Sequence, residues 1–436
     1  MEASLGLYLL LIFLFFIFAG VPIAIAIGVA SVSVMLSVIP YNVVAITSGQ
    51  KLATGIDSFS LLAVPFFVLA GNIMNQGGIA TRLVNFAYLF VGKVPGSLCH
   101  VNVLSNMMFG SVSGSAVAAA AAVGKTLLPE IKNAKIDVHT ATAINIASCP
   151  TGMLIPPSNG LIVYSVVSGG TSIGALFLAG YVPGILMGLS CMVVAYIIFK
   201  LKPHLAGINL NNSLNLKKIA LVTWQAIPSL GLIVVVIGSI IGGICTATEA
   251  ACMAVLYSLF LSLLYRTIDL KVLKTISKDT ILISGVVLFL IGASTIMSYI
   301  MAYAHIPQTV SEAILSITDN KILILLLINI ILLIVGMFMD MTPAILIFTP
   351  IFLPIAKTIG IDPVHFGIIM CFNLCIGIVT PPVGTALFVG CSVSGSKIEQ
   401  VIKPLLPLIF AEIFILLLVT YVSSLSLVIP RYFGFI

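Results

Sequence analysis

Charge is what this sequence has least of. The 436 residues include 19 Lys and Arg and 13 Asp and Glu, or 7% of the chain, whereas a soluble domain typically has about a quarter. No such residue lies between Glu2 and Lys51 or between Asp137 and Lys200, and each interval has room for two membrane crossings of about 20 residues. With 60% hydrophobic residues, the composition predicts an all-α polytopic membrane protein and excludes a soluble enzyme, a nucleic-acid binder or a disordered chain.

Two further absences concern cysteine chemistry and targeting. The eight cysteines include no CxxC pair, so they are expected to be small buried side chains rather than metal ligands or disulfides. Glu2 stands where a secretory signal peptide has basic residues, and the apolar run continues past Gly20-Val21-Pro22. The first segment is therefore expected to stay in the protein as a membrane span.

The basic residues form short clusters, as is typical of cytoplasmic loops. These clusters are Lys93, Lys125 to Lys135, Lys200 to Lys218, Arg266 to Lys278 and Lys397 to Lys403. If all face the cytoplasm, residues 98–124 start and end on the same side and are too few to cross twice, so they predict a re-entrant hairpin. Following the alternation of sides predicts a second hairpin, 321–357, that enters from the opposite face.

The two halves of the chain share features about 225 residues apart. Leu128-Pro129 corresponds to Leu353-Pro354, and Pro156-Pro157 corresponds to Pro381-Pro382. With oppositely oriented hairpins, this offset predicts two inverted repeats, as in many secondary transporters. The predicted repeats are residues 1–210 and 219–436, joined by a cytoplasmic linker at 211–218, with broken helices at 137–168 and 363–396 and both termini periplasmic. Residues 41–57 and 267–280 are predicted to be helices lying in the membrane interface.

The hairpin tips and broken helices combine Gly or Pro with polar side chains inside apolar runs. Irregular backbone at membrane depth is tolerated only where it is buried in protein or lines a cavity. Freed carbonyls together with Ser, Thr and Asn oxygens form a neutral ligand set that suits Na⁺. Any one of these side chains could instead pack or bond to its own helix, but four clusters placed symmetrically favour ion binding. The predicted Na⁺ ligands are Gly110, Ser111, Ser113, Ser115, Asn145 and Thr151 in one site, and Gly336, Asp340, Thr342, Asn373, Thr380 and Thr385 in the other.

Arginine is scarce as well, and none of the three arginines lies in a hairpin tip or a broken helix. An anionic substrate would then be held by helix N-termini, hydroxyls and bound cations. The predicted substrate-binding residues are Ser113, Ser115, Pro156, Ser158, Thr342, Pro381 and Thr385. Two other carboxylates lie in apolar segments: Glu249 is predicted to cap a helix in a capping box with Thr246, and Glu412 is expected to face a second subunit or the membrane interface.

Several longer motifs resemble one known family. They are GVPIAIAIG from Gly20, GSVSGSAVA from Gly110, PTGMLIPPSN from Pro150, TATEAA from Thr246, and the stretch from Gly336 to Gly390 with TPPVGTALF. Together they are similar to the large membrane subunit of TRAP transporters, the tripartite ATP-independent periplasmic transporters, over essentially the whole chain. Ala247 replaces the proline that is usual in TPTEAA, which affects only the stiffness of that turn.

The resemblance implies more than the composition does. It implies an elevator transporter of the bacterial inner membrane, with a scaffold and a mobile transport domain, driven by a Na⁺ gradient. It also implies a small four-helix membrane subunit and a periplasmic substrate-binding protein as partners. The implied substrates are carboxylates, and the motifs look most like those of large subunits from sialic acid systems.

Three alternatives remain open from the sequence. One is a stand-alone ion-coupled carboxylate symporter that needs no partner. An intramembrane enzyme is disfavoured, because the broken segments contain one carboxylate and no nucleophile with a matching base. A channel is also disfavoured, because two inverted hairpins suit alternating gates better than one continuous pore.

Overall fold

The computed structural model describes residues 2–91, 94–207, 216–318 and 320–436, and in these ranges all regular structure is helical. Five residues of the predicted linker, 211–215, lie outside the described residues. The first half contains α1 (Glu2–Phe18), α2 (Ile23–Val38), α3 (Tyr41–Ile56), η1 (Phe59–Leu62), α4 (Ala63–Gln76), α5 (Ile79–Val91), α6 (Ser97–Ser113), α7 (Ala116–Asn133), α8 (Val138–Ser148), α9 (Thr151–Leu154), α10 (Asn159–Val167), α11 (Ile173–Leu201) and η2 (Pro203–Leu205). The second half contains α12 (Leu216–Ile241), α13 (Ala247–Leu264), α14 (Leu270–Tyr303), α15 (Ile306–Ile317), α16 (Lys321–Phe338), α17 (Met341–Thr358), α18 (Pro363–Gly377), α19 (Thr385–Ser394), α20 (Ile398–Tyr421) and α21 (Ser424–Tyr432).

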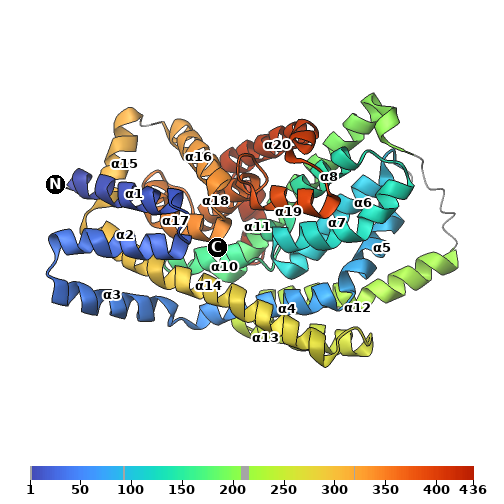
Figure 1. Cartoon of the computed structure of the whole chain (residues 1–436), viewed down its shortest axis with the longest axis horizontal. Coiled ribbons are helices and arrows are strands. Elements are labelled where there is room, and N and C mark those ends of the chain that lie inside the picture. The colour runs from blue at the N-terminus through green and yellow to red at the C-terminus, as the bar shows by residue number, and fades with distance from the viewer. Residues whose placement is uncertain (1, 92–93, 208–215, 319) are drawn as a thin grey trace.

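The helices form two layers. The first layer consists of α2, α3, α4, α13 and α14, in which α14 packs on α2, α3 and α4, and α13 packs on α4. The second layer contains α6 to α11 and α16 to α20, held together by contacts such as α6 with α7, α16 with α18, and α20 with α8 and α11. Figure 1 shows the first layer along one long side of the molecule and the second layer above it. Each layer takes helices from both halves of the sequence.

The outer surface of the helices is apolar. Among the described residues, eight helices are long and apolar enough to cross a membrane. Large hydrophobic side chains project outward from them, including Trp224, Val234 and Ile281, each at least 70% exposed. Such a surface is incompatible with water over most of the molecule, so the chain is a multi-pass membrane protein.

One predicted element is wrong. Residues 267–280 do not form a separate interfacial helix, because most of them belong to α14, which continues without a break for 34 residues. Asp269 caps its start by accepting a hydrogen bond from the Val272 amide at 2.7 Å. The first turns of α14 contain three lysines and an aspartate. These charged side chains determine which part of the helix surface faces water, but they do not interrupt the hydrogen bonding of the helix. At 1.5 Å per residue α14 is about 51 Å long, so it extends beyond a hydrocarbon core of about 30 Å.

The two segments in which hairpins are predicted are each a pair of helices joined by a tight turn. Gly114, with a φ of +60°, links α6 to α7, a backbone conformation that favours glycine. Met339 and Asp340 link α16 to α17. The observed pairs extend from Ser97 to Asn133 and from Lys321 to Thr358. The side from which each pair enters the membrane stays a prediction.

The two predicted broken helices are interrupted at equivalent places. α8, α9 and α10 are separated at Cys149-Pro150 and again at 155–158, and α18 and α19 are separated by 378–384. Both double prolines contain a cis peptide bond, Pro156-Pro157 and Pro381-Pro382.

Glycine contacts between each hairpin and a broken helix recur in the two halves. A Cβ built on Gly110 would lie 2.2 Å from the Cα of Gly152, and one built on Gly377 would lie 2.4 Å from the Cα of Gly336. The two pairs are about 225 residues apart. In both halves, therefore, only glycine lets the hairpin backbone touch the broken helix.

Candidate functional site

A cavity of about 190 Å³ lies between the two layers. One wall belongs to the first layer and comes from α4 and α14, including Asn72, Ile283 and Val287. The other wall belongs to the second layer and contains both hairpin tips together with Met153 and the start of α10. The tips meet here although they are far apart in the sequence, and none of the described residues that line the cavity is a lysine or an arginine.

Three helices begin at this cavity. The first turn of α7, Asn159 and Gly160 at the start of α10, and Asp340 and Thr342 at the start of α17 all line it. A helix N-terminus has a partial positive charge of about half an elementary charge and offers free amide donors. The cavity is therefore electropositive where α7 and α10 start, while the exposed carboxylate of Asp340 makes the α17 side a place for a cation.

The predicted residues of the first hairpin tip line this cavity. Ser115 is the N-cap of α7, and its hydroxyl accepts a hydrogen bond from the Ala118 amide at 3.3 Å. Ser113 is 5% exposed, and its hydroxyl donates to the Ser115 carbonyl at 3.4 Å. The first layer touches this tip closely, because a Cβ on Gly71 would lie 3.1 Å from the Cα of Ser113. The side chain of Ser111 lies outside the described residues.

In the second half, Asp340 and Thr342 line the cavity, whereas Asn373 does not line it and has a free oxygen in the protein core. The amide nitrogen of the fully buried Asn373 donates to Asn329 Oδ1 at 2.7 Å and to the Ile369 carbonyl at 2.8 Å. Both donor hydrogens are then used, and Oδ1 has no hydrogen-bond partner. The Thr385 side chain is close enough to the Asp340 carboxyl to interact with it. The Thr385 hydroxyl oxygen is buried and forms no hydrogen bond that meets the usual distance and angle limits. These oxygens are available to a cation.

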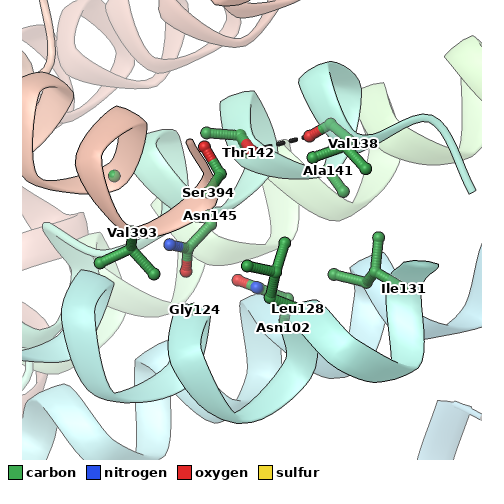
Figure 2. A pocket seen from close by; sticks show the side chains of 11 residues that line it. Asn102, Gly124, Leu128, Ile131, Val138, Ala141, Thr142, Asn145, Val393 and Ser394 are labelled. Carbon is green, nitrogen blue, oxygen red and sulfur yellow. Dashed lines mark hydrogen bonds between the residues drawn. The ribbon is translucent and has the colours of Figure 1, made fainter. Parts of the chain in front are cut away.

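In the first half, the free oxygen belongs to a residue other than the predicted one. Asn145 donates to the Ala120 carbonyl at 3.0 Å, and its own Oδ1 accepts from Asn106 Nδ2 at 3.1 Å. The unpartnered oxygen is Asn106 Oδ1. Asn145 instead borders a separate cavity of about 20 Å³, where Figure 2 shows it pointing toward α7 near Gly124, with Val393 of α19 beside it.

The remaining predicted residues do not line the cavity. Gly110 and Gly336 are the close-packed glycines, and the hydroxyls of Thr151 and Thr380 donate to carbonyls of their own segments, at 2.6 and 2.7 Å. Ser158 caps α10 and donates to the Met153 carbonyl, so its hydroxyl is occupied. Pro156 and Pro381 belong to the two cis-proline turns, and neither lines the cavity.

Sequence reasoning missed Asn72, Asn106, Asn159 and Asn329. Each is an asparagine within or at the start of a helix, a signal that is visible but unspecific. Asn72 donates to the Thr280 hydroxyl at 3.0 Å, a contact between residues 208 positions apart. This long-range pairing joins α4 to α14 and places a polar side chain on the first-layer wall.

The two carboxylates left unassigned to a site have different outcomes. The prediction for Glu249 is confirmed, since it forms a capping box with Thr246, whose amide donates to Glu249 Oε2 at 2.7 Å. The expectation for Glu412 is wrong. It is completely buried inside this chain, where Cys191 Sγ donates to Oε1 at 3.4 Å and Oε2 has no partner. α11 crosses α20 at this point, and a single sequence does not reveal that packing.

Comparison with known proteins decides the family. The sequence matches the family model described as the tripartite ATP-independent periplasmic transporter, DctM component, over residues 10–425. The chain belongs to this family. The resemblance found from the motifs is thereby confirmed, and the DctM subunit described here is a transporter component, consistent with a protein that is not an enzyme.

Individual relatives support the same assignment. This DctM subunit is 52% identical to the uncharacterized protein YgiK of Salmonella typhimurium over 402 residues, covering 92% of this chain and 91% of that one. It is 39% identical to the sialic acid TRAP transporter large permease protein SiaM of Vibrio cholerae, covering 88% and 90%. It also resembles the crystal structure of the YdaH transporter of Alcanivorax borkumensis, with a TM-score of 0.59, 14% identity and 88% of each chain covered. At that identity the likeness shows the fold alone.

Proposed function

We propose that this DctM subunit carries out Na⁺-coupled uptake of a carboxylate substrate. The observation that carries the proposal is the cavity between the layers, where three helix N-termini and the carboxylate of Asp340 face one space. Helix N-termini attract anions, and a carboxylate among free oxygens attracts a cation. The substrate anion and Na⁺ then sit side by side and partly neutralise one another. Enclosing a site that holds both ions therefore costs less free energy than enclosing a site that holds only one of them.

The Na⁺ sites proposed are the two predicted groups, with one change. In the second group, Asp340, Asn373 and Thr385 supply the available oxygens. In the first group, Asn106 joins the hairpin-tip serines, because its Oδ1 is free whereas that of Asn145 is used. A neutral amide or hydroxyl oxygen is a suitable ligand for Na⁺ and leaves the positive charge available to the substrate.

The two-layer arrangement supports an elevator movement. The cavity lies at the boundary between layers, so sliding of the second layer along the first would carry both hairpin tips and their ligands together. The wall contributed by α14 is apolar, with Ile283 and Val287, and therefore makes no strong polar contact that such a movement would break. We place the first layer as scaffold and the second as transport domain.

Membership of the family implies a small membrane subunit and a periplasmic substrate-binding protein as partners, and a location in the bacterial inner membrane. Sialic acid is one proposed substrate because SiaM of Vibrio cholerae is named for it. That relative is 39% identical, whereas the 52% identical relative has no named substrate, so other organic acids remain in the proposal.

The test is uptake into proteoliposomes that contain this subunit with its small subunit and binding protein. A panel of carboxylates, including sialic acid and C4-dicarboxylates, is offered with and without a Na⁺ gradient. We expect accumulation of one substrate class only with inward-directed Na⁺. Uptake that is equally fast in K⁺ would refute coupling to Na⁺, and uptake without the small subunit and binding protein would establish the stand-alone symporter instead.

The role of Asp340 is tested by Asp340→Asn, with Asp362→Asn as the matched control. Both residues are N-caps, of α17 and α18, but Asp362 is occupied in accepting from the Val364 amide at 2.7 Å and does not line the cavity. We expect Asp340→Asn to raise the Na⁺ concentration needed for half-maximal uptake at least tenfold, and Asp362→Asn to leave it unchanged. Equal effects of the two substitutions would refute a cation site at Asp340.

A further inference from the structure

A second, larger cavity lies away from the hairpin tips. It has a volume of about 610 Å³ and runs between the last turns of α11 and the first turns of α20, with the start of α8 at one end. It opens to the outside, since Ile197 and Leu201 in its wall are 47% and 75% exposed. The outside of the molecule is lipid at these helices, so the groove is open to the bilayer.

The lining of this groove is divided along its length. Lys202, Lys403, His139 and Gln400 lie at or near the ends of the three helices, where the chain leaves the membrane. Along α11, the apolar wall continues inward from Leu201 to Val194. The eight helical steps from Val194 to Lys202 extend over about 12 Å, which is most of the roughly 15 Å of hydrocarbon in one leaflet.

The polar end has an excess of positive charge. Lys202 and Lys403 are exposed, and neither forms an ion pair within the part of the chain that the structure describes. The one carboxylate in the lining, Asp137, is already used as the N-cap of α8, where it accepts from the Thr140 amide at 2.7 Å and from the Thr140 hydroxyl at 2.6 Å. A ligand at this end would therefore meet two free ammonium groups.

We propose that this groove binds an anionic phospholipid, with its phosphate between Lys202 and Lys403 and an acyl chain along the Val194 to Leu201 face of α11. A basic pocket between membrane helices is the kind of site that holds acidic lipid headgroups. The apolar wall is what distinguishes a lipid from a soluble phosphate. Because the lipid contacts both α11 and α20, it bridges the two helices that are also linked by the hydrogen bond from Cys191 to Glu412.

The experiment uses the purified full-length chain in a mild detergent with equal amounts of phosphatidylglycerol and phosphatidylcholine of the same acyl chains. Native mass spectrometry measures which lipid is retained. Each lysine near a headgroup contributes about 1 kcal/mol, so two lysines predict a preference of about 30-fold for phosphatidylglycerol. Lys202→Gln with Lys403→Gln should abolish that preference, whereas Lys271→Gln with Lys274→Gln, an equal loss of exposed charge on α14, should not.

A second variant tests the apolar part of the groove. Ile197→Trp fills the groove while leaving both lysines in place, and it should lower retention of phosphatidylglycerol to the level of phosphatidylcholine. Excess glycerol phosphate should not displace the lipid. The proposal is overturned if the wild-type protein shows no preference for phosphatidylglycerol, or if the Lys271 and Lys274 variant loses as much of that preference as the Lys202 and Lys403 variant. Displacement of the lipid by glycerol phosphate would also overturn it. A last refuting result would be that a cysteine placed at Leu201 crosslinks to a co-purified protein.

Discussion

A single added methyl group at Gly377 tests the packing that holds the second hairpin to its broken helix. A Cβ at this position would lie 2.4 Å from the Cα of Gly336 and 2.7 Å from its carbonyl oxygen, whereas ordinary contact begins at 3.4 Å. The obstructing atoms are backbone, so no side chain can rotate out of the way. The two helices must separate by about 1 Å, and overpacking of this kind costs about 1–3 kcal/mol.

This separation should affect both stability and ion binding. Asn373 lies one helical turn before Gly377, so moving α18 displaces the free Oδ1 of Asn373 from the proposed Na⁺ site. We expect Gly377→Ala to lower the apparent melting temperature of the purified protein and to raise the Na⁺ concentration for half-maximal uptake. Gly285→Ala is the control, because nothing lies within 4 Å of a Cβ there and alanine is the better helix former. Equal melting temperatures for the two variants would refute the close-contact argument.

Three further predictions test other parts of the structure. Asn329→Leu removes the acceptor that orients the Asn373 amide, a hydrogen bond that contributes about 1 kcal/mol. We therefore expect roughly a fivefold higher Na⁺ concentration for half-maximal uptake, with an unchanged maximal rate. An unchanged Na⁺ requirement would contradict this prediction. Glu412→Gln should keep thermal stability, since it preserves shape and removes a buried carboxyl whose Oε2 has no hydrogen-bond partner. Glu412→Ala leaves a void and should cost about 2 kcal/mol or more, and equal losses of stability in the two variants would contradict this prediction. A cysteine replacing the exposed Lys397 should react with an impermeant maleimide from the cytoplasm, and one replacing the exposed Tyr432 should react from the periplasm. Labelling of both cysteines from the same side would overturn the predicted inversion.

The positions of the helix breaks could be predicted from the sequence because their causes are local. Glycine and proline act on the backbone within a few residues, so the double prolines at Pro156 and Pro381 indicated irregular segments without any knowledge of packing. The error at α14 arises because charged side chains, unlike glycine and proline, do not constrain the backbone. A cluster of lysines suggested an interfacial helix, but charge alters the surroundings of a helix without ending it, and there is no proline or turn sequence between Asp269 and Tyr303 to end it.

The choice of liganding oxygen could not be predicted, because it depends on long-range donors. Asn145 and Asn106 are equally plausible ligands in the sequence, and only their packing reveals that Asn106 donates to Asn145 across 39 residues and leaves its own oxygen free. The same holds for Asn72, whose place on the cavity wall is set by Thr280, 208 residues away. Residue type predicted the kind of chemistry, while tertiary hydrogen bonding selected the atoms.

The low charge of the cavity gives a physical reason for coupling. Taking about half a positive charge for each of the three helix N-termini and one negative charge for Asp340, the empty cavity carries only about half a positive charge. A Na⁺ ion alone would raise this balance to about one and a half positive charges, whereas Na⁺ together with a monovalent anion leaves it at about half a positive charge, so the anion lowers the electrostatic cost of binding Na⁺. Removing the carboxylate in Asp340→Asn raises the balance to about one and a half positive charges. That variant should therefore need more Na⁺ for uptake, yet it should bind the anionic substrate in the absence of Na⁺ at least as tightly as the natural protein does. A Na⁺-free substrate affinity that falls along with Na⁺ binding would show that Asp340 holds the substrate directly, and that the helix N-termini do not.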